Sequence, residues 1–207
     1  VIFNGVDLDK FRPKIDATPF LEKYNLPKDK KIISFIGTFA TQYDFDMMFA
    51  VAEYYIKRED WVFVFIGGGS QAEKVNTTHL PNLIKVAWVD HDEMPSAWAC
   101  STITIWAMRL APLYEGTIPA KWFEATACGV PIVAAQTGIV ASLIHDNNLG
   151  IVTPVGDVDE MIGAVARLMD DEALLEDCAM RARAYAETHF SPARVVDAYE
   201  GILNTLV

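Results

Sequence analysis

The sequence is poor in cysteine and in basic residues, and it lacks any long apolar run. Three cysteines, Cys100, Cys128 and Cys178, lie far apart among 207 residues without a CxxC pair. This pattern favours free thiols in a reducing compartment, so we expect a cytoplasmic protein. No apolar run approaches the roughly 20 residues of a membrane-spanning helix. Lysine and arginine number 17 against 28 aspartates and glutamates, for a formal net charge of −11. A nucleic-acid partner, which needs a basic surface, is therefore not expected.

The sequence also lacks the short signatures of several enzyme classes. It contains no GxSxG or HExxH motif, and GGGSQAEK at 67–74 matches neither GxGxxG nor the phosphate-loop pattern GxxxxGK[ST]. The 4 histidines are scattered without metal-ligand spacing, so we expect no metal site. The chain begins on VIFNGVD, without methionine, and we expect it to be a piece of a longer protein.

Short apolar runs alternate with helical patterns from residue 32 onward. Near-continuous apolar strands are typical of a parallel sheet that helices cover on both faces. Strands are expected at 32–37, 62–69, 82–89, 102–108, 131–135 and 150–155. The predicted fold class is α/β, with a single Rossmann-like, doubly wound parallel sheet of about six strands whose carboxyl ends bind ligands.

Capping residues and apolar stripes mark the helices. Asp44 is expected to cap a helix, Asp157 and Glu160 resemble a capping box, and Ser191-Pro192 opens a last helix. The helix after Asp44 has apolar residues at helical spacing, namely Phe45, Met48, Phe49, Ala52, Tyr55 and Ile56. The last helix has an apolar face of Val195, Val196, Tyr199, Ile202, Leu203 and Leu206.

Three segments follow from these patterns. We expect a lead-in at 1–31 that starts with a short strand, a Rossmann-like domain at 32–190, and a C-terminal helix at 191–207. The large aromatic side chains of Trp88, Trp98, Trp106 and Trp122 are expected in the core or at an interface.

The stretch GTIPAKWFEATACGVP, residues 116–131, carries the strongest candidate site. Pro119 suits the first position of a helix, after a turn at Gly116 and Thr117. Lys121 then lies in the first helical turn, where a basic side chain costs roughly 0.3–1 kcal/mol unless an anion offsets it. The exposed amides of that turn, together with the Lys121 ammonium, form an anion site of the size of a diphosphate.

Glu124 lies three residues beyond Lys121, on the same helix face. Its carboxylate could accept hydrogen bonds from two hydroxyls, as in the recognition of a ribose diol. The alternative is a plain i, i+3 ion pair between the two side chains. The stretch GTFATQ at 37–42 offers further backbone amides for a phosphate, or else only a tight turn.

At these residues the chain resembles the C-terminal, nucleotide-sugar-binding lobe of GT-B glycosyltransferases of the retaining family 4 type. NGVDLDKFRP resembles the family's interdomain segment, and FIGGGSQAEKV resembles its VGDGPE turn. VDHDEMPSAWACSTITIWAM is similar to V-x-H-E-E-L-P…A-D-V-F-V-L-P, and IPAKWFEATACGVPIVA to P-S-K-L-F-E-Y-M-A-x-G-K-P-V-V-A. The matches keep their order along nearly the whole chain.

The resemblance implies two Rossmann-like lobes, with a UDP- or GDP-sugar donor bound mostly to this one and with no cofactor or metal. Lys121 and the amides near Thr117 would hold the diphosphate, and Glu124 would bind the ribose; both side chains are the catalytic candidates. The backbone near Val89 would face the base, and Gly37 would let the other lobe's ligand approach. The implied donor-binding residues are Gly37, Thr38, Val89, Gly116, Thr117, Ile118, Lys121 and Glu124.

The resemblance also implies an acceptor and a mechanism. A sugar or lipid-linked acceptor would bind through the missing N-terminal lobe, in the cytoplasm or peripherally at the inner membrane face. The C-terminal helix at 191–207 would pack toward that lobe. Retaining transfer of this kind proceeds as a front-face displacement that needs no protein nucleophile. Many members separate two glutamates by seven residues, whereas eight separate Glu115 and Glu124 here. Thr41 and Gln42 replace a basic residue that many members carry, so Lys121 is expected to be the main cation.

Other classes of protein remain possible when only the residues are considered. A non-catalytic nucleotide-binding module would carry the same motif. A nucleotide-sugar epimerase of the same fold would need a pair of acid/base carboxylates at the cleft, and no convincing pair is evident. A receiver-like signalling domain would need acidic residues at the end of its first strand, where FIGTFA has none.

Overall fold

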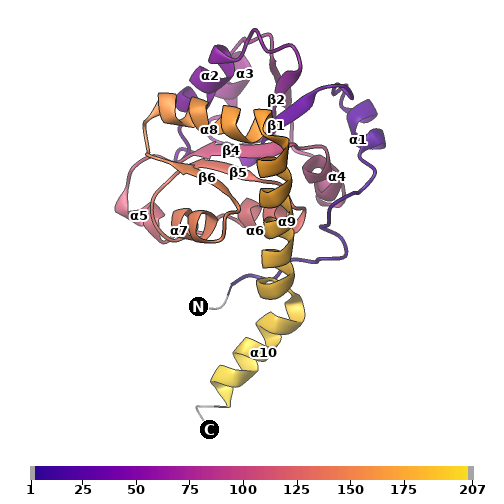
Figure 1. Cartoon of the computed structure of the whole chain (residues 1–207), viewed down its shortest axis with the longest axis vertical. Helices are drawn as coiled ribbons and strands as arrows, with labels where there is room; N and C mark the ends of the chain where they lie inside the picture. Colours follow the sequence, from indigo (N-terminus) through magenta and orange to yellow (C-terminus); the bar gives the residue numbers. More distant parts are fainter. Residues whose placement is uncertain (1–2, 205–207) are drawn as a thin grey trace.

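Six parallel strands form one sheet in the computed structural model, which describes residues 3–204 (Figure 1). The strands are β1 (Lys31–Thr38), β2 (Trp61–Gly68), β3 (Leu83–Val86), β4 (Ile103–Ala107), β5 (Ile132–Ala135) and β6 (Gly150–Thr153). Their order is β3-β2-β1-β4-β5-β6, and every pairing is parallel. The order of the strands reverses between β1 and β4, which is where sheets of this kind bind ligands. The predicted fold class is confirmed.

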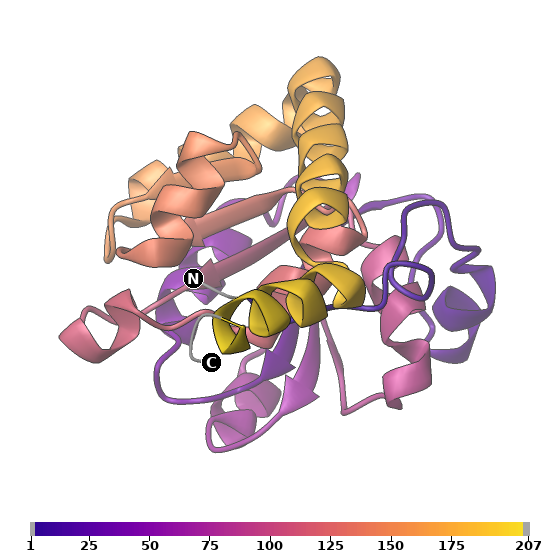
Figure 2. The same ribbon diagram turned by 90° about the horizontal axis from the view of Figure 1, so that it is seen from below.

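Helices cover both faces of the sheet, as a parallel sheet with buried strands requires. They are α1 (Thr18–Lys23), α2 (Phe45–Tyr54), α3 (Ala72–Thr77), the 3₁₀ helix η1 (His91–Glu93), α4 (Met94–Ala99), α5 (Pro112–Glu115), α6 (Ala120–Ala127), α7 (Ile139–Asp146), α8 (Val158–Asp170), α9 (Glu172–His189) and α10 (Pro192–Leu203). Figure 1 shows α2 and α8 on one side of the sheet and α6 and α7 on the other. Helix α9 contacts both α6 and α8, and α10 projects away from the sheet (Figures 1 and 2).

The predicted helix caps are confirmed. The side chains of Asp44, Asp157 and Ser191 each accept a hydrogen bond from a backbone N–H three residues later, at the starts of α2, α8 and α10. Each bond satisfies one of the donors that a helix start leaves without an intrahelical partner.

Several element boundaries differ from the prediction. Residues 3–30 contain no strand, and helix α1 forms within this lead-in. Helix α2 ends at Tyr54, so Ile56 follows it and is partly exposed. Strand β3 ends at Val86, which pairs with Ile66 of β2. The next two residues of β2, Gly67 and Gly68, pair with β1 and not with β3. Val89 therefore lies in the loop after the strand.

The apolar face of α10 is largely exposed, with Val196, Tyr199 and Leu203 more than half accessible. Leu206, which was predicted to share this face, lies outside the described residues. The expectation that this helix packs toward another lobe, and the division into three segments, stay predictions. Among the described residues, none of the helices combines the length and apolarity required to cross a bilayer.

The lead-in segment is bound to the C-terminal end of α9. The N–H of Val6 donates to the carbonyl of Phe190 at 2.9 Å. The Arg183 guanidinium of α9 donates to the carbonyls of Phe11 and Ala127, both at 2.9 Å, and to that of Leu8 at 3.3 Å. One side chain thus joins the lead-in, α6 and α9.

Arg183→Ala should destabilise the chain by about 2–3 kcal/mol, because three carbonyls lose a charged donor. Arg181→Ala is the matched control on the same helix, since among residues 3–204 Arg181 forms only an exposed i, i+4 pair with Asp177. Its loss should cost a few tenths of a kcal/mol. Urea unfolding of both variants measures the difference; equal midpoints would contradict the role given to Arg183.

Candidate functional site

The candidate site is a cavity of about 480 Å³ at the carboxyl ends of the strands. Its lining comes from the end of β1, the segments that follow β1, β3 and β4, and the start of α6. It consists of Ile36, Gly37, Thr38, Gln42, Tyr43, Trp88, Val89, His91, Met94, Met108, Thr117, Pro119, Ala120, Lys121 and Glu124. A larger cavity of about 630 Å³ lies at the opposite edge of the sheet, beside the starts of β2 and β3. The smaller cavity is the better candidate, because ligands of doubly wound sheets bind at the carboxyl edge.

Helix α6 carries Lys121 and Glu124 to this cavity. The helix begins at Ala120, one residue later than predicted, because Pro119 has the extended ψ of 143° of an N-cap residue. Lys121 is therefore the second helical residue, still in the first turn. The N–H groups of a first turn have no intrahelical acceptor and point along the helix axis toward an anion.

Lys121 does not extend into solvent. The side chain is only 7% exposed, and no acceptor for its Nζ exists among the described residues. The nitrogen lies 3.3 Å from the ring centroid of Phe35 and 4.1 Å from that of Tyr43. Desolvation lowers the pKa of Lys121 well below its ordinary value, and the charge of Glu124 opposes this shift only in part.

Two opposing energies act on the charged form of Lys121 in this pocket: its attraction to the aromatic rings and the cost of its removal from water. A desolvated cation–π contact stabilises a cation by about 2 kcal/mol. Removing an ammonium from water costs several kcal/mol, and hydrogen bonds to acceptors normally offset that cost. Since Nζ has no acceptor within the described part of the chain, the cost exceeds the gain, and burial opposes the charged form of the amine.

Gly37 makes room for this lysine. Its φ of +133° is a conformation that side-chain-bearing residues rarely adopt, and a Cβ there would lie 3.1 Å from Cε of Lys121 and 3.4 Å from its Nζ. The sequence predicted that Gly37 leaves space for a ligand of the other lobe. In the structure, Lys121 occupies the space beside it.

Glu124 is held by a tryptophan rather than by the lysine. Nε1 of Trp98 donates to Oε2 of Glu124 at 3.0 Å. No close ion pair joins Glu124 to Lys121 among the described side chains, so the plain i, i+3 pair is not formed. Desolvation raises the pKa of Glu124, against the Trp98 hydrogen bond and the nearby His91 and Lys121. The carboxylate also lines a second hollow, beside the lead-in.

The other predicted residues divide into two groups. Thr38, Val89 and Thr117 line the cavity, whereas Gly116 and Ile118 do not. Gly116 is exposed as the C-cap residue of α5, and Ile118 packs against the core. The donor-binding roles assigned to these residues stay predictions.

Two lining residues were not recognised in the sequence. Trp88 was expected in the core or at an interface, but it is 57% exposed at the cavity, whereas Trp98, Trp106 and Trp122 are fully buried. Its indole lies so close to Gly68 that a Cβ there would be 2.7 Å from Nε1. His91 lines both the cavity and the neighbouring hollow. A position just after the expected strand at 82–89 was the available signal for His91, whereas Trp88 was predicted to lie within that strand.

A metal role finds no support in these side chains. Among residues 3–204, no group of three or more His, Cys, Asp or Glu side chains is placed to hold a metal ion. At the cavity, the Lys121 side chain and the first turn of α6 lie next to the Glu124 carboxylate.

Comparison with known proteins identifies the family. The family model for glycosyl transferases group 1 matches residues 16–185. The chain belongs to this family. D-inositol 3-phosphate glycosyltransferase 2 of Catenulispora acidiphila is 29% identical over 197 residues, covering 88% of this chain and 45% of that protein. The chain spans about half the length of the curated relatives it matches first.

Solved structures share the fold of this glycosyltransferase family member. A sucrose-phosphate synthase from Thermosynechococcus elongatus superposes with a TM-score of 0.81 at 19% identity, over 99% of this chain and 52% of that one. Anabaena Alr3699/HepE, solved in complex with UDP and glucose, gives a TM-score of 0.78 at 19% identity, over 100% of this chain and 56% of that one. The chain has the Rossmann-like fold of the C-terminal lobe of GT-B enzymes.

Lys121→Met should stabilise the ligand-free chain by about 1–4 kcal/mol at neutral pH, because an apolar side chain of similar length needs no acceptor. The unfolded chain binds more protons at Lys121 than the folded one below its ordinary pKa of 10.5, so the folded state is penalised there. The gain should therefore shrink as the pH rises toward that value.

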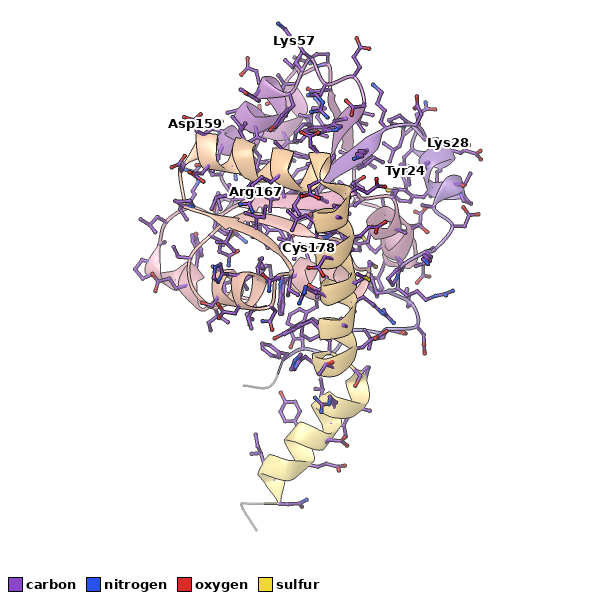
Figure 3. The ribbon with its side chains drawn as sticks, viewed as in Figure 1. Tyr24, Lys28, Lys57, Asp159, Arg167 and Cys178 are labelled. Carbon is purple, nitrogen blue, oxygen red and sulfur yellow. The ribbon has the colours of Figure 1, made fainter. Side chains whose placement is uncertain are left out.

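Lys57→Met is the matched control, because Lys57 is exposed at the surface beyond α2 (Figure 3). It should change the stability by less than about 0.5 kcal/mol. Thermal unfolding of both variants between neutral and alkaline pH measures the effect. A loss of stability in Lys121→Met at neutral pH would show that the lysine has partners that hold its charge.

Proposed function

We propose that this chain is the donor-binding half of a retaining glycosyltransferase that moves a sugar from a nucleoside-diphosphate sugar to an acceptor hydroxyl. The observation that carries the proposal is the buried amino group of Lys121, which has no acceptor among the described residues and lies where the strand order reverses. A buried polar group of this kind is costly, and a diphosphate is the ligand that would satisfy it. The neighbour solved with UDP supports the choice of a nucleotide donor.

The donor would extend across the cavity from α6 toward β3. Its diphosphate would lie at the first-turn amides of α6, with Lys121 and Thr117 beside it. Glu124 would accept hydrogen bonds from the ribose hydroxyls. The base, of the uracil or guanine type, would reach the loop after β3, where the backbone of Val89 and the exposed indole of Trp88 lie.

Catalysis in this proposal depends on position and charge. The bond between the sugar's anomeric carbon and the diphosphate oxygen breaks as the acceptor hydroxyl arrives on the same face. A phosphate oxygen takes the hydroxyl proton, so no protein nucleophile is required. Lys121 and the α6 amides stabilise the negative charge that develops on the departing diphosphate.

The acceptor, a sugar or lipid-linked hydroxyl, would be bound by a second lobe, in the cytoplasm or at the inner membrane face. This chain alone should then bind UDP or GDP with a millimolar-range Kd without transferring sugar. Glycosyl transfer by the 207-residue chain alone would contradict this division of labour.

Lys121→Ala in the full-length enzyme should lower kcat by about 10²–10³-fold, since a charge-assisted contact to the leaving group is lost. Lys57→Ala should leave kcat unchanged. Steady-state assays with UDP- and GDP-sugars measure both variants. A near-normal rate for Lys121→Ala would refute the assignment, and binding without transfer by the full-length protein would indicate a non-catalytic nucleotide-binding module.

Trp88→Ala should weaken UDP or GDP binding by about tenfold, because loss of base stacking costs about 1–3 kcal/mol. Tyr54→Ala is the control, since Tyr54 is an exposed aromatic residue at the end of α2, outside the cavity lining. Titration calorimetry measures both affinities. An unchanged affinity in Trp88→Ala would place the base elsewhere.

A further inference from the structure

Lys121 has a geometry that conflicts with simple contact to a phosphate. Although the residue lines the cavity, its Nζ is inaccessible to solvent. The nitrogen lies against the rings of Phe35 and Tyr43, on the inner side of Gly37. A phosphate oxygen must come within hydrogen-bond distance of this nitrogen to be stabilised by it. The side chain must therefore leave the aromatic pocket when the diphosphate binds.

The groups around the nitrogen leave it without a compensating charge. From α6, Glu124 is near enough to act through its charge but forms no close ion pair with Lys121 among the described residues. Burial raises the pKa of Tyr43, in the loop before α2, to about 12, so it stays neutral. Strand β1 contributes Phe35 and Gly37, which carry no charge.

Three further ionisable groups lie in the cavity lining or next to a lining residue in the chain. After β4, an Nη of Arg109 lies 3.9 Å from Oδ1 of Asp44, so these two side chains form an ion pair with each other. His91 lies across the cavity, at η1. None of these groups donates to or accepts from the Lys121 nitrogen in the described part of the chain.

We propose that Lys121 is stored as a neutral amine between the two rings and that it takes up one proton from solvent as the donor's diphosphate draws it into the cavity. The inference rests on the proposed function and adds to it that donor binding is coupled to the uptake of one proton. The amine lone pair accepts the proton, and the resulting ammonium donates N–H hydrogen bonds to phosphate oxygens. Gly37 permits the movement, because a side chain there would meet the lysine stem.

This coupling gives the donor site a defined pH dependence. Where the free diphosphate is already deprotonated, each binding event must still take a proton from solvent. The affinity for UDP or GDP should then fall about tenfold for each rise of one pH unit between about pH 8 and 9.5. A lysine that is charged before binding would give a flat affinity over the same range.

The test is calorimetric titration of the chain with UDP and with GDP at about pH 8, in buffers of low and high ionisation enthalpy. The slope of binding enthalpy against buffer ionisation enthalpy counts the protons exchanged. We expect an uptake close to one proton per nucleotide. Exchange near zero, together with an affinity that does not change between about pH 8 and 9.5, would overturn the inference.

Three variants identify the residue that takes up the proton. Lys121→Arg keeps a permanent charge, so it should bind without uptake. His91→Gln and Glu124→Gln should keep the uptake of about one proton even where their affinities differ, and loss of uptake in either would move the proton to that residue. Binding without proton exchange contradicts this inference and leaves the proposed function intact. Absence of UDP and GDP binding contradicts both.

Discussion

The Lys121 amino group is buried between two aromatic rings without an acceptor among the described residues, and the local structure of the carboxyl edge is arranged around it. Gly37 has to be glycine because of its φ and because the lysine stem fills the space beside it. Nε1 of Trp98 donates a hydrogen bond to the Glu124 carboxylate, and no close ion pair joins that carboxylate to the lysine among the described residues. The protein thus retains a costly, unsatisfied group at one point, as binding sites do when a ligand is to complete them.

The sheet order is what brings the parts of this site together. The site draws on chain segments after β1, β3 and β4, which are far apart in sequence but end at one edge of the sheet. Between β1 and β4 the connections turn to opposite faces, which leaves a cavity at the strand ends. The lead-in, held by Arg183, lines the adjacent hollow on the side of Glu124. Fold and site therefore depend on each other at this edge.

Much of the fold could be predicted, because it follows from local patterns. The apolar strands and the caps at Asp44, Asp157 and Ser191 depend on neighbours in sequence, and the structure has them. Boundaries set by pairing in space could not be read this way, as the early end of β3 shows. The spacing of Lys121 and Glu124 predicted a shared helix face, but not the rings that enclose the lysine. Phe35 and Tyr43 come from β1 and the loop after it, and no short-range signal connects them to α6. Trp88 was expected in the core or at an interface because large aromatic residues usually are, and its exposure depends on the loop that β3 leads into.

The central claim, that the α6 start and Lys121 hold a diphosphate, is tested most directly by mapping where a nucleotide binds. UDP or GDP added to the isotopically labelled chain should shift the backbone amide signals of Gly37, Thr38 and the non-proline residues of 117–122 most strongly, and uridine or guanosine should leave those of 117–122 nearly unchanged. Shifts concentrated instead at the larger cavity, around Leu26, Arg58 and Asn82, would contradict the account.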